Sequence, residues 1–344
     1  MLINNGSFGR GRNDLSIVIC THNRADDVGD CLAALLPQLD KSSTEVKVID
    51  SGSREDQRAD SGAIGCQPTP VQLVRIDEPG VSLARNRGIG ETNGEWVAFL
   101  DDDTIPSADW LENAHRLMSL VPEECAIIAG AVLPEFPKGA SRPLGKRWSQ
   151  VLSLVQRSGE GDCTASCSMV AANVLFRRLA LVEGEGFSTA LGRRGTTLLS
   201  GGEKLLQEQL IERGWSTWYS DRLKVRHKIS AERLTQKWIL RRAYWDGLSD
   251  QRISALNARK PNVLEVGKVL AKTLALSLVY FADTPRNEIR IRFWYNVGWL
   301  RERVVPGVRG IDCRPPRPGA GKTTASGAIK GLPVLTHAED GGAE

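Results

Sequence analysis

The sequence predicts an α/β domain, with a mostly parallel sheet and flanking helices, followed by a C-terminal helical extension. Short apolar runs alternate with amphipathic segments of helical period from residue 14 to about residue 230. This alternation is the pattern of βαβ units joined by right-handed crossovers. Polar clusters follow several of the runs, where parallel strands would end at one edge of the sheet. Beyond residue 230 the composition changes, and the helices expected there mix aromatic and basic residues.

The bulk properties of the chain exclude some classes of protein. Its 344 residues leave room for one large α/β domain and an appendage. The formal net charge of +4 is small for this length, so we expect no nucleic-acid partner. The seven cysteines form no disulfide framework, and the first residues show no signal-peptide pattern. We therefore expect a cytoplasmic protein.

The positions of the apolar runs predict the individual elements. Strands are expected over residues 15–20, 45–50, 71–76 and 96–100. Among the helices, one is expected to end near Leu39, one to cover residues 81–88 with Ser82 as its N-cap, and one to cover residues 107–120. In the second half, strands are expected over residues 169–176 and 221–227, with a helix over residues 204–213 between them.

Three consecutive carboxylates end the fourth strand, at Asp101, Asp102 and Asp103. If the strand continued through them, Asp101 and Asp103 would point to one side of the sheet and Asp102 to the other. Two carboxylates that converge on one point favour a hard divalent cation, Mg²⁺ or Mn²⁺, completed by substrate phosphates. The alternative is a solvated acidic turn before the next helix.

Other polar residues are expected at the same edge of the sheet. Thr21 and Arg24 follow the first strand, Asp50 ends the second, and Arg85 lies on the following helix. A nucleotide-shaped ligand across this edge would meet all of them before it reached the acidic triplet. Guanidinium groups can bind phosphate, and Asp50 can accept hydrogen bonds from a base or a ribose.

Four successive motifs resemble those of family 2 glycosyltransferases with the GT-A fold. They lie at residues 16–24, 48–53, 80–88 and 99–104, and the likeness extends over roughly residues 14–230. It implies a nucleotide-sugar donor, usually a UDP-sugar, a divalent metal at the acidic triplet, and inversion at the anomeric carbon. We expect donor binding by Thr21, Arg24, Asp50, Arg85, Asp101 and Asp102. We expect a metal site at Asp101, Asp103 and His227.

The second half of the domain should supply a catalytic base. An inverting transfer needs a carboxylate that takes the proton of the acceptor hydroxyl, and Glu203, after a glycine turn, is our candidate. The family often has two acids here, whereas this chain has Lys204, which leaves the base open. Glu203 could instead be an acid favoured by a helix N-terminus. His227 resembles the downstream histidine that completes the metal shell in some GT-A enzymes, or it is structural.

The regions outside the domain carry separate expectations. Residues 1–13 are predicted to form a flexible lead-in, and residues 313–344, rich in Pro, Gly and Ala, a disordered tail. The helical extension over residues 231–312 mixes tryptophans with Lys and Arg. Such helices can lie peripherally on the cytoplasmic, inner face of a membrane with anionic lipid, cap the core of the domain, or pair two subunits in a homodimer.

The sequence thus predicts an inverting, metal-dependent glycosyltransferase. It would move a sugar from a nucleotide-sugar donor to a glycan or lipid-linked acceptor in cell-surface polysaccharide synthesis. One alternative is a nucleotidyltransferase that forms nucleotide sugars, but that class should carry a Gly-rich loop after the first strand, and residues 21–24 lack glycine. The other alternative is a degenerate subunit that binds the donor but lacks a catalytic base, because Lys204 stands where the family often has a second acid.

Overall fold

The computed structural model describes residues 14–39, 44–58, 71–140, 146–166, 169–195, 197–259, 262–280 and 287–304. All of them belong to one compact unit of the chain. The predicted lead-in over residues 1–13 and the predicted tail over residues 313–344 lie outside the described residues, so both stay predictions.

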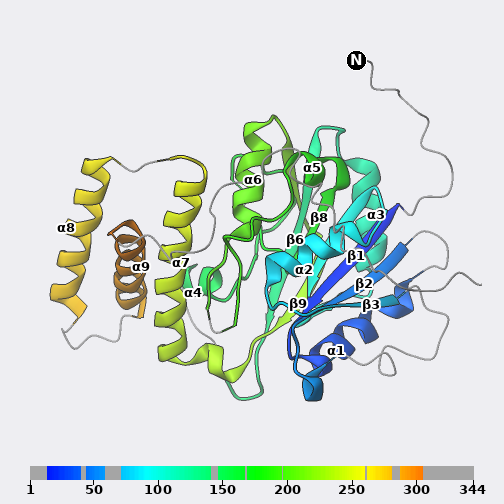
Figure 1. Cartoon of the computed structure of the whole chain (residues 1–344), viewed down its shortest axis with the longest axis horizontal. Helices are drawn as coiled ribbons and strands as arrows, with labels where there is room; N and C mark the ends of the chain where they lie inside the picture. Colours follow the sequence, from blue (N-terminus) through cyan, green and yellow to red (C-terminus); the bar gives the residue numbers. More distant parts are fainter. Residues whose placement is uncertain are drawn as a thin grey trace, which may run out of the picture. The chain divides into compact units, whose positions relative to one another are not determined.

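The first half of the domain is a parallel sheet in the order β3-β2-β1-β4. Figure 1 shows β1, β2 and β3 side by side. Its strands are β1 (Leu15–Thr21), β2 (Thr44–Ser51), β3 (Val71–Ile76) and β4 (Trp96–Asp101). Between them lie α1 (Ala25–Leu35), the 3₁₀ turns η1 (Leu36–Gln38) and η2 (Glu55–Gln57), and α2 (Val81–Gly90). The central strands are buried on both faces, which explains their continuous apolar sequences.

The second half extends the sheet with strands of both directions. These are β5 (Thr104–Pro106), β6 (Cys125–Glu135), β7 (Glu160–Asp162), β8 (Asn173–Arg177) and β9 (Ser216–Lys228). β8 runs antiparallel between β4 and β6, whereas β6 and β9 are parallel; β5 and β7 pair antiparallel with β9. The predicted α/β class is confirmed, and the antiparallel ladders are all in the half with the weaker sequence pattern.

Helices cover both faces of the sheet and close two apolar cores. The remaining helices of the domain are α3 (Trp110–Leu120), α4 (Lys146–Val151), α5 (Arg178–Glu183) and α6 (Gly202–Glu212). Ile17 of β1 packs with α1 and α3 through Val28 and Trp110, whereas its neighbour Val18 faces the core that contains Leu206 of α6. Alternate residues of β1 therefore stabilise opposite faces of the sheet.

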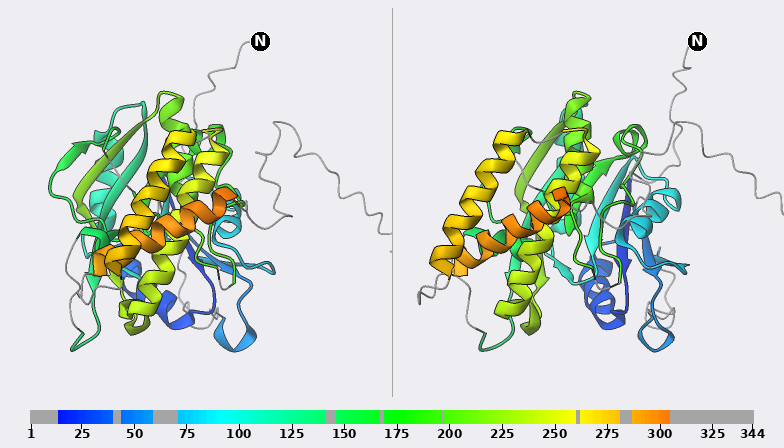
Figure 2. Two further views of the ribbon diagram at one scale, coloured as in Figure 1. Left: turned by 90° about the vertical axis from the view of Figure 1, so that its left-hand side faces the viewer. Right: turned by 60° about the vertical axis from the view of Figure 1, so that its left-hand side comes forward.

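The extension begins with the turn η3 (Ala231–Leu234) and contains α7 (Gln236–Leu256), α8 (Val263–Tyr280) and α9 (Asn287–Val304). α7 packs on the domain, where Ile253 joins a core with Leu199 and Leu205. α9 crosses α7 and α8 (Figure 2). α7 therefore caps the core of the domain, which is one of the three roles that the sequence left open for the extension. Among the described residues, no helix has the length and apolar content needed to cross a membrane.

One predicted helix start is wrong in a way that affects the site. Gly80, and not Ser82, is the N-cap residue of α2. The hydroxyl of Ser82 instead donates a hydrogen bond to the carbonyl oxygen of Leu191, 2.8 Å away. The side chain expected to cap the helix therefore ties it to the loop before α6. The helix predicted from residue 107 begins at Trp110, and the strand predicted from residue 169 begins at Asn173.

Candidate active site

A cavity of about 450 Å³ lies at the end of β1 and β4 where the acidic triplet begins. Its walls come from the loops after these strands, the first turn of α2, the loop before α6, and the start of the extension. With the exception of Asp50, every residue predicted for the site lines it: Thr21, Arg24, Arg85, Asp101, Asp102, Asp103, Glu203 and His227. The carboxyl ends of β1 and β4, together with α2, α6 and β9, thus bring these side chains into one space.

Asp50 lies behind the cavity, at the end of β2. Its side chain is buried, and one carboxylate oxygen accepts a hydrogen bond from the backbone N–H of Ser53 at 3.3 Å. The other oxygen, Oδ2, is buried without a hydrogen-bond partner in the described part of the protein. Such orphaned acceptors are rare and often mark a place where a ligand donates. The next residue, Ser51, does line the cavity.

The acidic triplet does not continue the strand as the sequence suggested. β4 ends at Asp101, and Asp102 and Asp103 lie in the turn that follows. The expectation that Asp102 points away from Asp103 is wrong, because Nη1 of Arg24 lies 3.0 Å from an oxygen of Asp102 and 2.8 Å from one of Asp103. Thr21 donates its hydroxyl to the other oxygen of Asp102 at 2.8 Å. Because Asp102 and Asp103 lie in a turn, their side chains do not alternate between opposite faces as those of a strand would.

Asp103 is surrounded by cationic and imidazole groups. Besides Arg24, it binds Nη2 of Arg233 at 3.0 Å, and Nε2 of His227 lies 3.4 Å from its other oxygen. Burial acts to raise the pKa of Asp103, but His227, Arg233 and Arg24 together hold that pKa well below its usual range. At Asp102 burial has the larger effect, and it raises the pKa to about 7 against the attraction of Arg24. The two neighbouring acids therefore differ strongly in their affinity for a proton.

The donor atoms around the triplet suit a hard divalent ion, although the described residues contain no preassembled group of three metal ligands. The side chain of Asp101 is 35% exposed, against 7% for Asp102 and Asp103. Nε2 of His227 is 2.8 Å from Nη1 of Arg233, and its Nδ1 is buried with no partner among the described residues. Carboxylate oxygens fit Mg²⁺ or Mn²⁺, with the remaining positions left for water and phosphate.

Glu203 lies in the first turn of α6, after Gly201, whose φ of +89° is a left-handed value that favours glycine. Its Oε2 is 3.5 Å from Nη1 of Arg85, and Nη2 of Arg85 is 3.3 Å from Asp101. Arg85 thus links the candidate base to the acidic triplet. Lys204 does not share this environment, since its ammonium group binds Asp250 of α7 at 2.7 Å.

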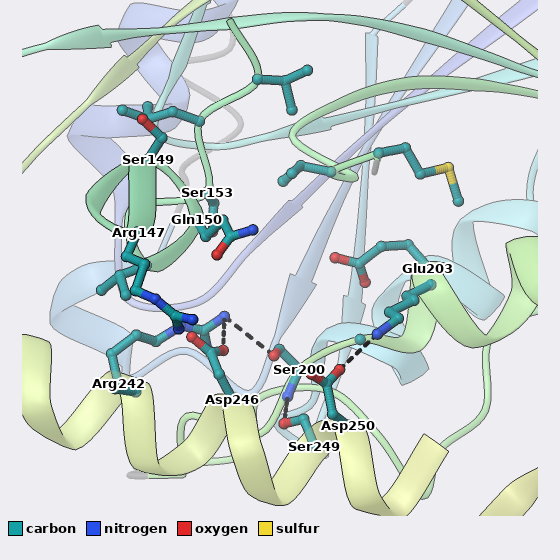
Figure 3. A pocket seen from close by; sticks show the side chains of 18 of the residues that line it. Arg147, Ser149, Gln150, Ser153, Ser200, Glu203, Arg242, Asp246, Ser249 and Asp250 are labelled. Carbon is teal, nitrogen blue, oxygen red and sulfur yellow. Dashed lines mark hydrogen bonds and ion pairs between the residues drawn. The ribbon is translucent and has the colours of Figure 1, made fainter. Parts of the chain in front are cut away.

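A second cavity, of about 700 Å³, adjoins the first at Glu203 (Figure 3). It lies between α4, α6, α7 and α9, and the lining residues that it shares with the first cavity are Ser153, Val170, Ser200, Glu203 and Arg242. Asp250 of α7 accepts a hydrogen bond from the hydroxyl of Tyr295 at 2.6 Å. Asp246 binds Arg242 at 2.8 Å, and burial raises its pKa to about 6 although Arg242 opposes the shift.

Apart from Glu203, the residues of this second cavity were not predicted as site residues from the sequence. Arg242, Asp246, Ser249, Asp250 and Ile253 line it from a single helix. Their spacing of four, three, one and three residues places them on one face of α7. This polar stripe was present in the sequence, but nothing in the sequence showed that it faces a cavity. Arg233 was missed as well, and no local signal links it to Asp103.

Comparison with known proteins decides the family. A family model described as glycosyl transferase family 2 matches residues 16–178, the part from β1 through β8. The chain is a glycosyltransferase with the GT-A fold, and its residues 16–178 belong to glycosyl transferase family 2. The resemblance of the four sequence motifs is therefore confirmed, and the cavity at the sheet edge is the candidate active site of this glycosyltransferase.

The similarity to two relatives and to one solved structure extends over most of this chain. It is 23% identical to a glucosyl-dolichyl phosphate glucuronosyltransferase of Haloferax volcanii, over 79% of this chain and 86% of the relative. It is 24% identical to the succinoglycan biosynthesis protein ExoM of Rhizobium meliloti, over 71% and 76%. The fold is similar to that of a mannosyltransferase from Pyrobaculum calidifontis solved with GDP-Man and Mn²⁺, with a TM-score of 0.58, 15% identity and coverage of 86% and 88%.

Proposed function

We propose that this glycosyltransferase moves a sugar from a nucleotide-sugar donor in the first cavity to a hydroxyl of an acceptor in the second cavity, with inversion. Glu203 carries this proposal, because it lines both cavities. In an inverting displacement the acceptor oxygen attacks from the face opposite the departing diphosphate, and a carboxylate on that side takes its proton. A base at the junction of donor and acceptor spaces has the position that this reaction needs.

On the donor side, the charged groups match the parts of a nucleoside diphosphate, and we favour a UDP-sugar. The unpaired oxygen of Asp50 would accept a hydrogen bond from the base or the ribose. Arg24 and Arg85 would donate to the diphosphate, with Thr21 and Asp102 orienting Arg24 through their hydrogen bonds. Each of these groups would therefore serve a different part of the donor.

A divalent cation, Mn²⁺ or Mg²⁺, would be held by Asp101 and Asp103. When bound, such an ion stabilises the negative charge of the leaving diphosphate. The exposed carboxylate of Asp101 supports this role, as does the Mn²⁺ in the related mannosyltransferase structure. Asp103 and His227 would have to exchange contacts with Arg24 and Arg233 to coordinate it.

The acceptor would be a glycan or a lipid-linked sugar used in cell-surface polysaccharide synthesis. One relative is named for a dolichyl phosphate substrate and another for succinoglycan biosynthesis. The second cavity combines the paired acids of α7 with apolar side chains such as Met169 and Ile253. Carboxylates can read sugar hydroxyls, and apolar surface suits the faces of sugar rings or a lipid chain.

For a lipid-linked acceptor, α8 would place the protein on the cytoplasmic face of the membrane. Its exposed face carries Val263, Leu270, Leu274 and Leu278. On a helix these positions lie within about one third of the circumference, and Lys268 and Lys272 lie on the more polar side of the same helix. An apolar stripe beside lysines fits an interface with anionic lipid. A homodimer formed through the same stripe is the competing role.

The decisive experiment screens nucleotide sugars for thermal stabilisation of the protein, with and without Mn²⁺, and then assays transfer to an acceptor panel. We expect one nucleotide sugar to raise the melting temperature more with metal than with chelator. Asp101→Asn should reduce this metal-dependent increase. It is preferable to a change at Asp103, which would leave the buried Arg233 without its carboxylate partner.

The outcomes separate the rival functions. Transfer that persists at the parental rate in excess chelator would contradict the metal role. Formation of a nucleotide sugar from a sugar phosphate and a nucleoside triphosphate would identify a nucleotidyltransferase. Donor binding without transfer to any acceptor in a broad panel would support the donor-binding subunit.

A further inference from the structure

The donor cavity contains an arginine that has no carboxylate partner. Arg24, Arg85 and Arg233 bind acids of the triplet, and Arg242 binds Asp246. Arg193 lines the same cavity, but its guanidinium forms no hydrogen bond or ion pair with any residue in the described ranges. In a cavity where four other arginines bind carboxylates, Arg193 is therefore available to a bound anion.

The backbone around Arg193 is fixed to the first turn of α2. The carbonyl oxygen of Arg193 accepts a hydrogen bond from the N–H of Val81 at 3.2 Å, and Ser82 donates to Leu191. Between these contacts, Gly192 has a φ of +97°, and a Cβ there would lie 2.6 Å from the hydroxyl oxygen of Ser82. Only glycine allows this close approach. The loop therefore holds the backbone of Arg193 against the first turn of α2, where Gly80 and Val81 line the same cavity.

The electrostatic surroundings of Arg193 favour a bound anion. Burial, together with the nearby Arg242 and Arg233, lowers the pKa of its guanidinium to about 10, and Asp101 and Asp103 act in the opposite direction. The group stays positively charged at neutral pH, at a cost in desolvation and in repulsion from two arginines. A ligand with several negative charges would relieve both effects. The diphosphate of a nucleotide sugar is the anion that the proposed function brings to this cavity.

We propose that Arg193 binds the diphosphate of the nucleotide-sugar donor and stabilises the nucleoside diphosphate as it leaves. This inference rests on the proposed function. A planar guanidinium can donate two parallel hydrogen bonds to phosphate oxygens. The N-terminus of α2, to which the Arg193 loop is tied, adds the positive end of a helix of ten residues. The affinity for diphosphate therefore does not depend on a metal ion alone.

The test compares Arg193→Ala and Arg193→Lys with Arg194→Ala. Arg194 is a matched control, since it follows Arg193 in the same loop, pairs with the exposed Glu78 at 3.4 Å, and does not line the cavity. Isothermal titration measures binding of UDP, GDP, UMP and GMP, each with Mn²⁺ and with chelator. We expect Arg193→Ala to weaken diphosphate binding about 10- to 100-fold under both conditions, with a smaller effect on monophosphates. Arg194→Ala should match the parent.

The Arg193→Lys variant distinguishes loss of diphosphate binding from a folding defect caused by Arg193→Ala. It keeps a positive charge, so it should recover part of the diphosphate affinity, which a merely structural role of the side chain would not predict. Equal diphosphate affinity of Arg193→Ala and the parent would overturn the inference. A parent protein that binds neither UDP nor GDP is a different result, because it would remove the proposed function together with the inference.

Discussion

At the scale of single residues, the position of Glu203 separates it from its neighbour. Glu203 faces Arg85 and both cavities, whereas Lys204 is paired with Asp250 of α7. The lysine that replaces the second acid of the family is therefore tied to α7, at the second cavity. The ammonium group of Lys204 cannot accept a proton, so Lys204 does not compete with Glu203 for the role of base.

Glu203→Gln should lower the transfer rate by about 100- to 10,000-fold, which is the usual contribution of a positioned general base. Donor affinity should change little, because the groups proposed to bind the donor come from other elements. Lys204→Ala is the adjacent control and should be milder. Steady-state transfer kinetics and donor titration measure the two effects separately. Parental turnover by Glu203→Gln would place the base elsewhere.

The residues of the site could be predicted from sequence only where a local pattern marks them. Asp101 ends a short apolar strand, and Thr21 and Asp50 end others, so one edge of the sheet was expected to collect them. The pairing of Asp102 and Asp103 with Arg24 depends on a turn that the strand pattern did not reveal. Arg233 and Arg193 reach the cavity from distant segments, and no periodicity could link them to it.

At the scale of elements, the crossing of α7 and α9 depends on two glycines. A Cβ on Gly247 would overlap the carbonyl oxygen of Tyr295, and a Cβ on Gly298 would overlap that of Tyr244. The two helices therefore touch through their backbones. The buried pair of Arg252 and Glu302, 2.7 Å apart, lies between the same helices. The sequence predicted the helices. It could not predict that Gly247 and Gly298 allow a close helix crossing, because that role depends on which helix lies opposite.

Gly247→Ala should destabilise the protein by about 1–3 kcal/mol, as is usual when a methyl group is forced into a packed contact. Gly267→Ala in α8 is the control, since nothing lies within 4 Å of its Cβ position. That change should instead stabilise by about 0.5–1 kcal/mol, because alanine is the better helix former. Chemical denaturation measures both values. Similar effects of the two substitutions would argue against the close helix crossing.

At the scale of the whole molecule, the sequence predicted the parallel half of the sheet better than the rest. β1 to β4 follow from local apolar runs and βαβ crossovers. The antiparallel positions of β5, β7 and β8 depend on pairing between segments far apart in the chain. The tryptophans that suggested a membrane surface are also placed differently: Trp238, Trp245 and Trp294 pack within cores formed by the extension.

We therefore assign the proposed membrane role to α8. Leu274 and Leu278 are 67% and 81% exposed, and α9 packs against another side of the helix. Leaving such side chains in water forgoes about 1.5–3 kcal/mol each, which a lipid interface would recover. We therefore expect full-length protein to bind phosphatidylglycerol vesicles in a salt-sensitive manner, since Lys268 and Lys272 attract anionic lipid.

Leu274→Glu should weaken this binding by about 10- to 100-fold, because it removes apolar area and adds a charge that anionic lipid repels. Leu179→Glu is the matched control, as Leu179 of α5 is 56% exposed and lies outside the stripe. Vesicle sedimentation gives the partition of each variant, and analytical ultracentrifugation gives its oligomeric state. Loss of a dimer in Leu274→Glu, without any vesicle binding by the parent, would assign the stripe to a subunit contact. Equal vesicle binding by the parent and Leu274→Glu would remove α8 from the interface.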